Sequence, residues 1–294
     1  MKNILENFQL NDWETMPSSQ SQQQAIEALE NGLVVYLPHL PFQFQAQELA
    51  FLSPLITDGR AKNVSYDIRR QKLAGTVCKG EQASHLQAMM HRYAVQSRQL
   101  LELLFPHYVP TITQARTSYR PVEILGRKAL SYRKDDTLLH VDAFPASPVK
   151  GTRILRVFTN VNPNGQSRIW RTGEPFAHVV EKFAPQIKKP IPFLLHLQHM
   201  LKITRDYRTP YDHYMLNIHN NMKANNDYQK NVSQQEVHFP PGSTWFVYTD
   251  QVSHAAMSGQ YVFEQTFHLP VSGLKNPDTA PLKVLEKFFD KDLL

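Results

Sequence analysis

The first regular pattern of apolar and polar positions lies near the amino terminus. The stretch SQSQQQAIEALENGLVVYLP is typical of a helix that begins near Ser19 and stops before Gly32. The apolar run LVVYL that follows, residues 33–37, predicts a short buried strand. The chain therefore opens with a helix that leads directly into a strand.

A second and longer helical pattern occupies EQASHLQAMMHRYAVQSRQLLELLFPHY, and Pro106 ends it. Its apolar residues recur at helical spacing and form one stripe: Leu86, Met90, Tyr93, Leu101 and Leu104. Such a stripe is typical of a helix that packs on a sheet, so we assign it to the core.

From about residue 112 to residue 161 the pattern changes to short strands separated by turns. The candidate strands are TITQARTSYR, KALSYR, TLLHVDAF and RILRVFTNV, and the turn sequence NPNGQ precedes a further strand at SRIW. Residues 173–231 lean helical, with FLLHLQHMLKI as their apolar centre. Strands return in VHFPPGSTWFVYT and HAAMSGQYVFEQTFHLPV, and APLKVLEKFFDKDLL predicts an amphipathic closing helix.

Helices first, then two groups of strands split by an insertion, predict an α+β fold. Its centre would be an antiparallel β-sandwich or jelly roll with helices packed on an outer face. We expect a single domain over residues 1–294. It comprises helical support at 1–109, a jelly-roll core at 110–172 and 232–272, a helical insertion at 173–231 and a carboxy-terminal helix at 279–292.

Composition excludes some classes of function but does not identify one. The formal net charge of +6 and the pI near 9.2 fit an anionic substrate or surface, and the scattered basic residues do not indicate nucleic acid. The one cysteine, Cys78, excludes an intramolecular disulfide. The amino-terminal stretch carries acidic residues and no apolar core of signal-peptide length, and no apolar run reaches membrane-spanning length. These features predict a cytoplasmic protein, with peripheral contact at a membrane left open.

The pair His140 and Asp142, in LLHVDAFP, is the first candidate for chemistry. In an extended strand, residues two apart point to the same face, so the two side chains would share one space. Two histidines and one carboxylate are a ligand set for Fe(II). His254, in a later strand among small residues, is the best-placed second histidine. The alternative is a buried histidine hydrogen-bonded to an aspartate, and the residue types alone leave both interpretations open.

The other histidines are weaker candidates for the second histidine ligand. His238 precedes Phe-Pro-Pro and is expected at a turn, and His268 ends a strand. Four more lie in the insertion, where a lone histidine is more often solvated or satisfied by a hydrogen bond than a ligand: His196, His199, His213 and His219.

Two long segments closely resemble a known family. LLHVDAFPASPVKGTRILRVFTNVNPNGQSRIWRTGEPF and STWFVYTDQVSHAAMSGQYVFEQTFHLPV are similar to the Kdo hydroxylases, most strongly over residues 110–272. Those are Fe(II)- and 2-oxoglutarate-dependent dioxygenases of the lipopolysaccharide inner core. The resemblance implies a double-stranded β-helix, with His140, Asp142 and His254 as catalytic iron ligands, and 2-oxoglutarate and O2 as co-substrates. It also implies hydroxylation of carbon 3 of 3-deoxy-D-manno-oct-2-ulosonic acid (Kdo) on lipid A to give Ko, with succinate and CO2 released.

One position departs from the wider dioxygenase superfamily. Many members place an arginine or lysine about ten residues after the distal histidine, to bind the far carboxylate of 2-oxoglutarate, but Glu264 stands there in this chain. The cation must come from another strand, and Arg156 and Arg168 are our candidates, with a possible hydroxyl from Tyr132 on the strand before His140. Arg153 and Arg171 are possible replacements.

Three other functions remain as alternatives. A 2-oxoglutarate hydroxylase of a different substrate, such as a protein side chain, would use the same site. A non-enzymatic sugar-binding jelly roll would require an incomplete ligand set. A metallo-hydrolase is weaker, because no second cluster of carboxylates or histidines provides for a two-metal site.

Overall fold

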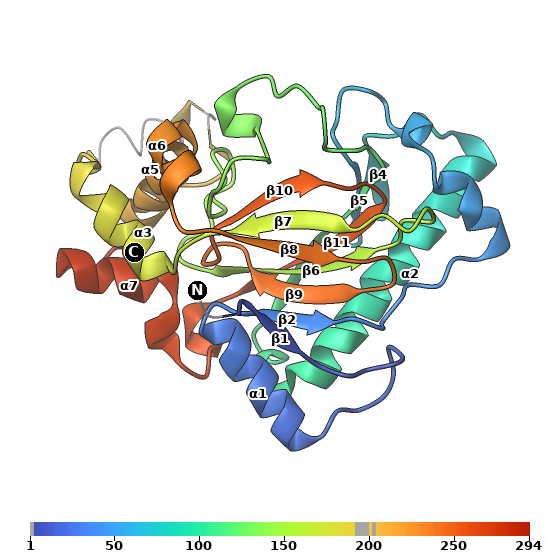
Figure 1. Cartoon of the computed structure of the whole chain (residues 1–294), viewed down its shortest axis with the longest axis horizontal. Coiled ribbons are helices and arrows are strands. Elements are labelled where there is room, and N and C mark those ends of the chain that lie inside the picture. The colour runs from blue at the N-terminus through green and yellow to red at the C-terminus, as the bar shows by residue number, and fades with distance from the viewer. Residues whose placement is uncertain (1–2, 192–199, 202–203) are drawn as a thin grey trace.

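A computed structural model of the chain describes residues 3–191, 200–201 and 204–294. Its strands form two sheets that face each other (Figure 1). The larger sheet, in spatial order, is β1 (Leu5–Asn7), β2 (Val34–Leu37), β9 (Thr244–Tyr248), β6 (Arg153–Asn160), β11 (Val262–Leu269), β5 (Thr113–Arg120), β3 (Val64–Asp67) and β4 (Lys72–Ala74). The smaller sheet is β10 (His254–Ser258), β7 (Arg168–Thr172) and β8 (Gln235–Phe239). All pairings are antiparallel except that of β1 with β2.

The helices lie in two groups (Figure 1). The first contains α1 (Ser19–Glu30) and α2 (Gly80–Leu104). The second gathers at the other end of the molecule: α3 (Phe176–Phe183), α5 (Pro210–Ala224), α6 (Asn226–Asn231) and α7 (Pro281–Phe289). The mixed α and β organisation expected from the sequence is confirmed, as are the two long amino-terminal helices and the strand that follows the first of them.

Alternation along the central strands sends side chains to two different cores. On β6, Leu155 and Val157 join the apolar cluster beneath α1 and α2, whereas Phe158 faces the smaller sheet. Between the sheets, Trp245 stacks on Phe239 with ring centroids 4.0 Å apart. The larger sheet is therefore covered on one face by helices and on the other by the smaller sheet, and Arg156, next to Phe158, faces the space between the sheets.

Two of the expected strands are wrong. Residues 128–133 form no strand, because this segment is exposed and pairs with no neighbouring strand among the described residues. Tyr132 begins a 3-10 turn, Tyr132–Lys134. The strand expected at TLLHVDAF makes only one bridge, between His140 and His254, after which the backbone of Asp142 bonds to Thr249 instead.

Elsewhere the differences are smaller. His238 lies within β8 rather than at a turn, where its exposed ring pairs with Glu236. The range 173–231 contains helices α3, α5 and α6, but most of its expected apolar centre, residues 193–203, lies outside the described residues. No helix in the described part of the chain is long and apolar enough to cross a bilayer.

Candidate active site

His140, Asp142 and His254 meet at one end of the space between the two sheets. The backbones of His140 and His254 exchange both hydrogen bonds of a β-bridge, at 3.0 and 2.9 Å, so the segment that carries His140 lies beside β10. Asp142 is held two residues further on by a hydrogen bond from its backbone N–H to the Thr249 carbonyl, at 2.7 Å. One ligand atom from each of the three side chains lies within 4.8 Å of the others.

Local hydrogen bonds orient both imidazoles. His140 Nδ1 lies 2.8 Å from the Leu138 carbonyl oxygen, and His254 Nδ1 lies 2.8 Å from the Val252 carbonyl oxygen. A carbonyl oxygen can accept a hydrogen bond only from a protonated ring nitrogen. Each bond therefore places the hydrogen on Nδ1 and leaves the Nε2 lone pair free. Both rings are therefore set to present Nε2 as a ligand.

The protonation states also suit a divalent cation. Burial lowers the pKa of His140 and of His254, and the proximity of the two rings lowers that of His140 further, so both are neutral at pH 7. Burial alone would raise the pKa of Asp142, but its surroundings, above all the Arg156 guanidinium, more than offset this, so its pKa lies below the ordinary value. The cluster thus offers two neutral imidazoles and one carboxylate.

The unsatisfied Oδ2 atom of Asp142 is the strongest indication that a ligand atom or ion fits between the three side chains. Arg156 Nη2 lies 3.0 Å from it, yet no described donor meets this buried oxygen in hydrogen-bond geometry. Two histidines and a carboxylate on one face are the donor set of non-haem Fe(II) sites. The residues present therefore fit an iron ion.

His140, Asp142 and His254 line a small cavity, and its wall also carries three arginines. Arg120, Arg156 and Arg168 line it together with Asp136, Phe158, Trp170 and Ala256. Arg156 pairs with Asp142 and Glu264, and Arg120 pairs with Glu264. Glu264, which occupies the position where a cation was sought, is therefore the carboxylate that holds two cations from neighbouring strands.

Arg168 is different, because it has no carboxylate partner among the described residues. Its Nη1 donates to the Gly259 carbonyl at 2.8 Å, and the side chain is buried. Burial, together with the nearby Arg120, lowers the pKa of Arg168 to about 9. Asp136 and Glu123 act on Arg168 electrostatically without pairing with it directly, so the charge of this buried guanidinium is incompletely compensated.

Gly259 allows this arrangement. Its φ is +104°, a conformation that side chains rarely adopt, and a Cβ there would lie 3.0 Å from the Arg168 Cα. The backbone of the turn after β10 can therefore approach β7 closely enough for its carbonyl to accept from the Arg168 side chain.

The remaining candidates from the sequence lie elsewhere. Tyr132 is 43% exposed, and its hydroxyl accepts from its neighbour Arg133 rather than lining the cavity. Arg153 pairs with Asp250 in the core, and Arg171 donates to Met257 Sδ and to the Thr137 carbonyl.

Sequence reasoning missed three residues of the site. Arg120 and Trp170 line the cavity, and Trp170 stacks on His254 with ring centroids 5.1 Å apart. His219, on α5, lies edge-on to His140 with ring centroids 5.0 Å apart; its Nδ1 lies 2.8 Å from the Val141 carbonyl oxygen, so it is satisfied by a hydrogen bond, as expected, but it lies beside the site. For Trp170 the sequence signal was alternation, which places it on the same strand face as Arg168, whereas Arg120 carried no such signal.

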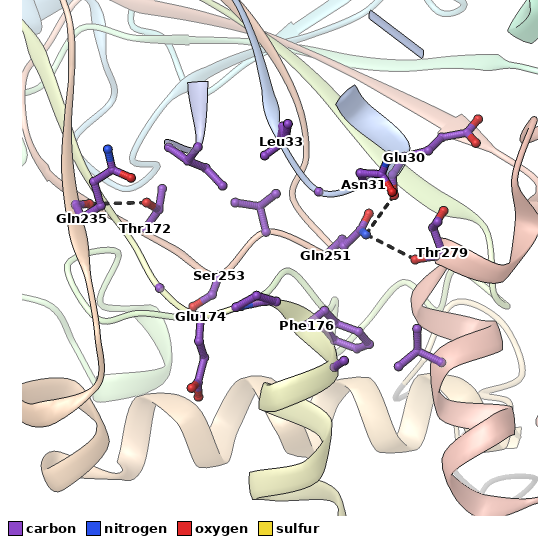
Figure 2. A pocket seen from close by; sticks show the side chains of 17 residues that line it. Glu30, Asn31, Leu33, Thr172, Glu174, Phe176, Gln235, Gln251, Ser253 and Thr279 are labelled. Carbon is purple, nitrogen blue, oxygen red and sulfur yellow. Dashed lines mark hydrogen bonds between the residues drawn. The ribbon is translucent and has the colours of Figure 1, made fainter. Parts of the chain in front are cut away.

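A larger cavity, of about 680 Å³, lies apart from these groups (Figure 2). Two of its polar side chains already bond within the fold: Gln251 Nε2 donates to the carbonyls of Glu30 and Thr279, and Thr172 donates to the Gln235 carbonyl. Figure 2 shows the carboxylate of Glu174 pointing away from the centre of the cavity. We therefore place the chemistry at the smaller cavity.

Comparison with known proteins decides the family. The model of the 3-deoxy-D-manno-oct-2-ulosonic acid (Kdo) hydroxylase family matches residues 12–292. The chain belongs to the Kdo hydroxylase family. It is thus an Fe(II)/2-oxoglutarate-dependent dioxygenase, and the family's activity implies a Kdo-containing substrate. A search of curated proteins gives no match.

Solved structures of Kdo hydroxylases agree over the whole fold. One, in complex with α-ketoglutarate and Fe(III), is 47% identical with a TM-score of 0.95, covering 99% of this chain and 97% of that one. A second, in complex with cobalt(II), is 48% identical with a TM-score of 0.96 over the same shares. A third, in complex with succinate and Fe(III), is 47% identical with a TM-score of 0.95, again over 99% and 97%. Iron and 2-oxoglutarate are therefore the cofactor and co-substrate of this family of structures.

Proposed function

We propose that this Kdo hydroxylase hydroxylates carbon 3 of Kdo in Kdo-lipid A to give Ko, at an Fe(II) ion held by His140, Asp142 and His254. The close approach of these three side chains carries the proposal. One 2-oxoglutarate and one O2 would be consumed for each Kdo hydroxylated, with release of succinate and CO2. The two facing sheets would form the double-stranded β-helix of this enzyme class, within a single dioxygenase domain.

Bound iron would supply the chemistry, by coupling decarboxylation of 2-oxoglutarate to insertion of one oxygen atom into a C–H bond. The protein's own groups orient the iron ligands. Arg156 holds the Asp142 carboxylate in its ionised form, and Trp170 fixes the plane of His254 by stacking. The carbonyls behind both histidines keep Nε2 directed into the cavity.

We assign the far carboxylate of 2-oxoglutarate to Arg168, with Arg120 beside it. Arg168 lacks a carboxylate partner among the described residues, whereas Arg156 already serves Asp142 and Glu264. A carboxylate at this end of the cavity would complete a charge-assisted pair and remove the cost of burying a lone guanidinium. Of the two arginines that the sequence suggested, Arg168 thus has the stronger support, and Arg156 acts through Asp142.

A turnover assay tests the substrate. Purified protein with Fe(II), 2-oxoglutarate and O2 is expected to convert Kdo-lipid A to a product one oxygen atom heavier, with one succinate per product. Lipid A without Kdo is the matched acceptor and should gain no oxygen. Succinate formation without a mass gain on Kdo-lipid A would contradict the proposed substrate. We expect this reaction at the cytoplasmic face of the inner membrane, where a lipid-anchored acceptor would be reached by peripheral contact.

A further inference from the structure

The segment between β5 and His140 is the most exposed apolar surface near the cavity. Residues 121–135, here called the rim loop, appear in green above β10 in Figure 1. Leu125 is 72% exposed and Leu130 is 89% exposed, the highest exposed fraction of any large apolar side chain in the described part of the chain. The loop begins directly after Arg120 and ends directly before Asp136, and both of these residues line the cavity. Its two ends are therefore part of the rim of the active site.

Both ends of the rim loop are held by contacts with the protein, whereas its tip projects into solvent. Ile124 is buried between the sheets, in the cluster that contains Trp170. The Glu123 carboxylate accepts from the backbone N–H groups of Ile124, Leu125 and Gly259. At the other end, Asp136 pairs with Arg127 and with Lys62.

Charge on the loop tip is of one sign. Residues 125–134, LGRKALSYRK, contain four basic residues and no acidic one. Lys128, Arg133 and Lys134 are exposed, whereas Arg127 is engaged by Asp136. Exposed leucines set among exposed basic side chains are the combination that binds the interface of an anionic bilayer, where apolar side chains enter the acyl boundary and cations meet phosphates.

We propose that the rim loop docks this enzyme on the surface of an anionic lipid bilayer, with Leu125 and Leu130 inserted and Lys128, Arg133 and Lys134 among the lipid phosphates. The inference rests on the proposed function in one respect: a lipid-anchored sugar would then meet the cavity at the membrane surface. A bilayer fits better than a protein partner, because the two exposed leucines share a short segment with exposed basic residues, which match the phosphates of an anionic lipid surface.

Vesicle binding tests this directly and requires neither iron nor Kdo. The full chain is mixed with vesicles of phosphatidylglycerol and phosphatidylcholine, or of phosphatidylcholine alone, and the bound fraction is measured by sedimentation. Wild-type protein should bind the anionic vesicles and release as salt is raised. We expect the Leu125→Glu/Leu130→Glu variant to bind about tenfold more weakly, and Lys128→Gln/Lys134→Gln to lose the preference for anionic vesicles.

Met16→Glu is the matched control. Met16 is 65% exposed and precedes α1, which lies on the opposite side of the molecule from the rim loop in Figure 1. This variant should bind vesicles as the wild type does. Wild-type protein that stays in the supernatant, or leucine variants that bind like the control, would overturn the proposal.

Turnover in two formats separates this inference from the proposed function. The leucine variant should hydroxylate Kdo-lipid A dispersed in detergent at the wild-type rate, but act about tenfold more slowly on Kdo-lipid A embedded in vesicles. Equal rates in vesicles for variant and wild type would overturn the docking role. Absence of turnover by wild-type protein in both formats would contradict the proposed substrate, and the vesicle-binding result would still decide whether the loop docks.

Discussion

At the scale of single residues, the site depends on which charges are already paired. Arg156 and Arg120 pair with carboxylates of the protein, whereas the partner of Arg168 among residues 3–191, 200–201 and 204–294 is a carbonyl. The distinction matters because a buried guanidinium binds an incoming carboxylate strongly only if it is not already neutralised. We therefore propose different roles for the three arginines of the cavity.

Arg168→Gln should weaken 2-oxoglutarate binding and leave iron binding intact. Removing one partner of a buried charge pair typically costs about 2–5 kcal/mol, so the KM for 2-oxoglutarate should rise about 30-fold or more. Arg171→Gln is the matched control, because Arg171 is the next arginine on the same strand and bonds to Met257 and Thr137 instead. Steady-state kinetics with varied 2-oxoglutarate provide the measurement, and an unchanged KM in Arg168→Gln would show that another cation binds the carboxylate.

The sequence carried the iron-ligand candidates further than the co-substrate site. His140 and Asp142 lie two positions apart, so strand periodicity alone predicted that they share one face. For the 2-oxoglutarate cation the sequence offered Arg156 and Arg168, and our proposal of Arg168 depends on the ion pair between Arg156 and Glu264, which the sequence does not show. Arg120 could not be found, because its place in the cavity depends on β5 lying next to β11, a pairing between residues about 140 positions apart.

At the scale of elements, one ion cluster ties three adjacent strands together. Glu264 on β11 pairs with Arg120 on β5 and with Arg156 on β6, and all three side chains face the smaller sheet. Burial alone would raise the pKa of Glu264, but Arg120 and Arg156 offset this and hold it below the ordinary value of 4.5. The cluster thus stabilises the strand order that brings Arg120 into the cavity.

Glu264→Gln should therefore destabilise the fold in a pH-dependent way. Because the pKa of Glu264 is lower in the folded state, its contribution is complete above pH 4.5 and is lost as the pH falls through the lowered value. Leaving two buried arginines with less charge compensation costs about 3 kcal/mol, so the Tm at pH 7 should fall by about 5 °C. This Tm difference from wild type should narrow below pH 4.5.

Thermal melts across pH 3–8 give the measurement, with Glu236→Gln as the control. Glu236 lies on β8, and its side chain is 61% exposed, so its loss should change the Tm little at any pH. A Glu264→Gln variant that melts with the wild type at pH 7 would show that the cluster does not hold the strands.

Helices defined by the spacing of their own apolar residues were predictable from the sequence. Strands that depend on a neighbouring strand were not. Helix α2 follows from the spacing of its own apolar residues, and its stripe is buried as expected. The KALSYR segment has residue types found in strands, but a strand also requires a neighbour to satisfy its backbone, and here the segment projects as the rim loop.

At the scale of the whole molecule, the two sheets divide the work of the site. The smaller sheet and the segment bridged to it supply His140, Asp142, His254 and Trp170, and the larger sheet supplies Arg120 and Arg156. The family match over residues 12–292 and the similarity to solved Kdo hydroxylases span both sheets. Neither half of the cavity is complete alone, so the site depends on the packing of Trp245, Phe239 and Phe158 between the sheets.

Anaerobic titration with Fe(II) in the presence of 2-oxoglutarate tests the central claim most directly. The wild-type chain should bind one iron, and His140→Ala, Asp142→Ala and His254→Ala should each lower the affinity about 100-fold or more, because loss of a ligand exceeds the usual effect of losing one of its supporting contacts. His238→Ala, an exposed histidine on β8, should bind as the wild type does. Wild-type affinity in any one of the three ligand variants, or no iron bound by the wild-type chain, would contradict the site described here.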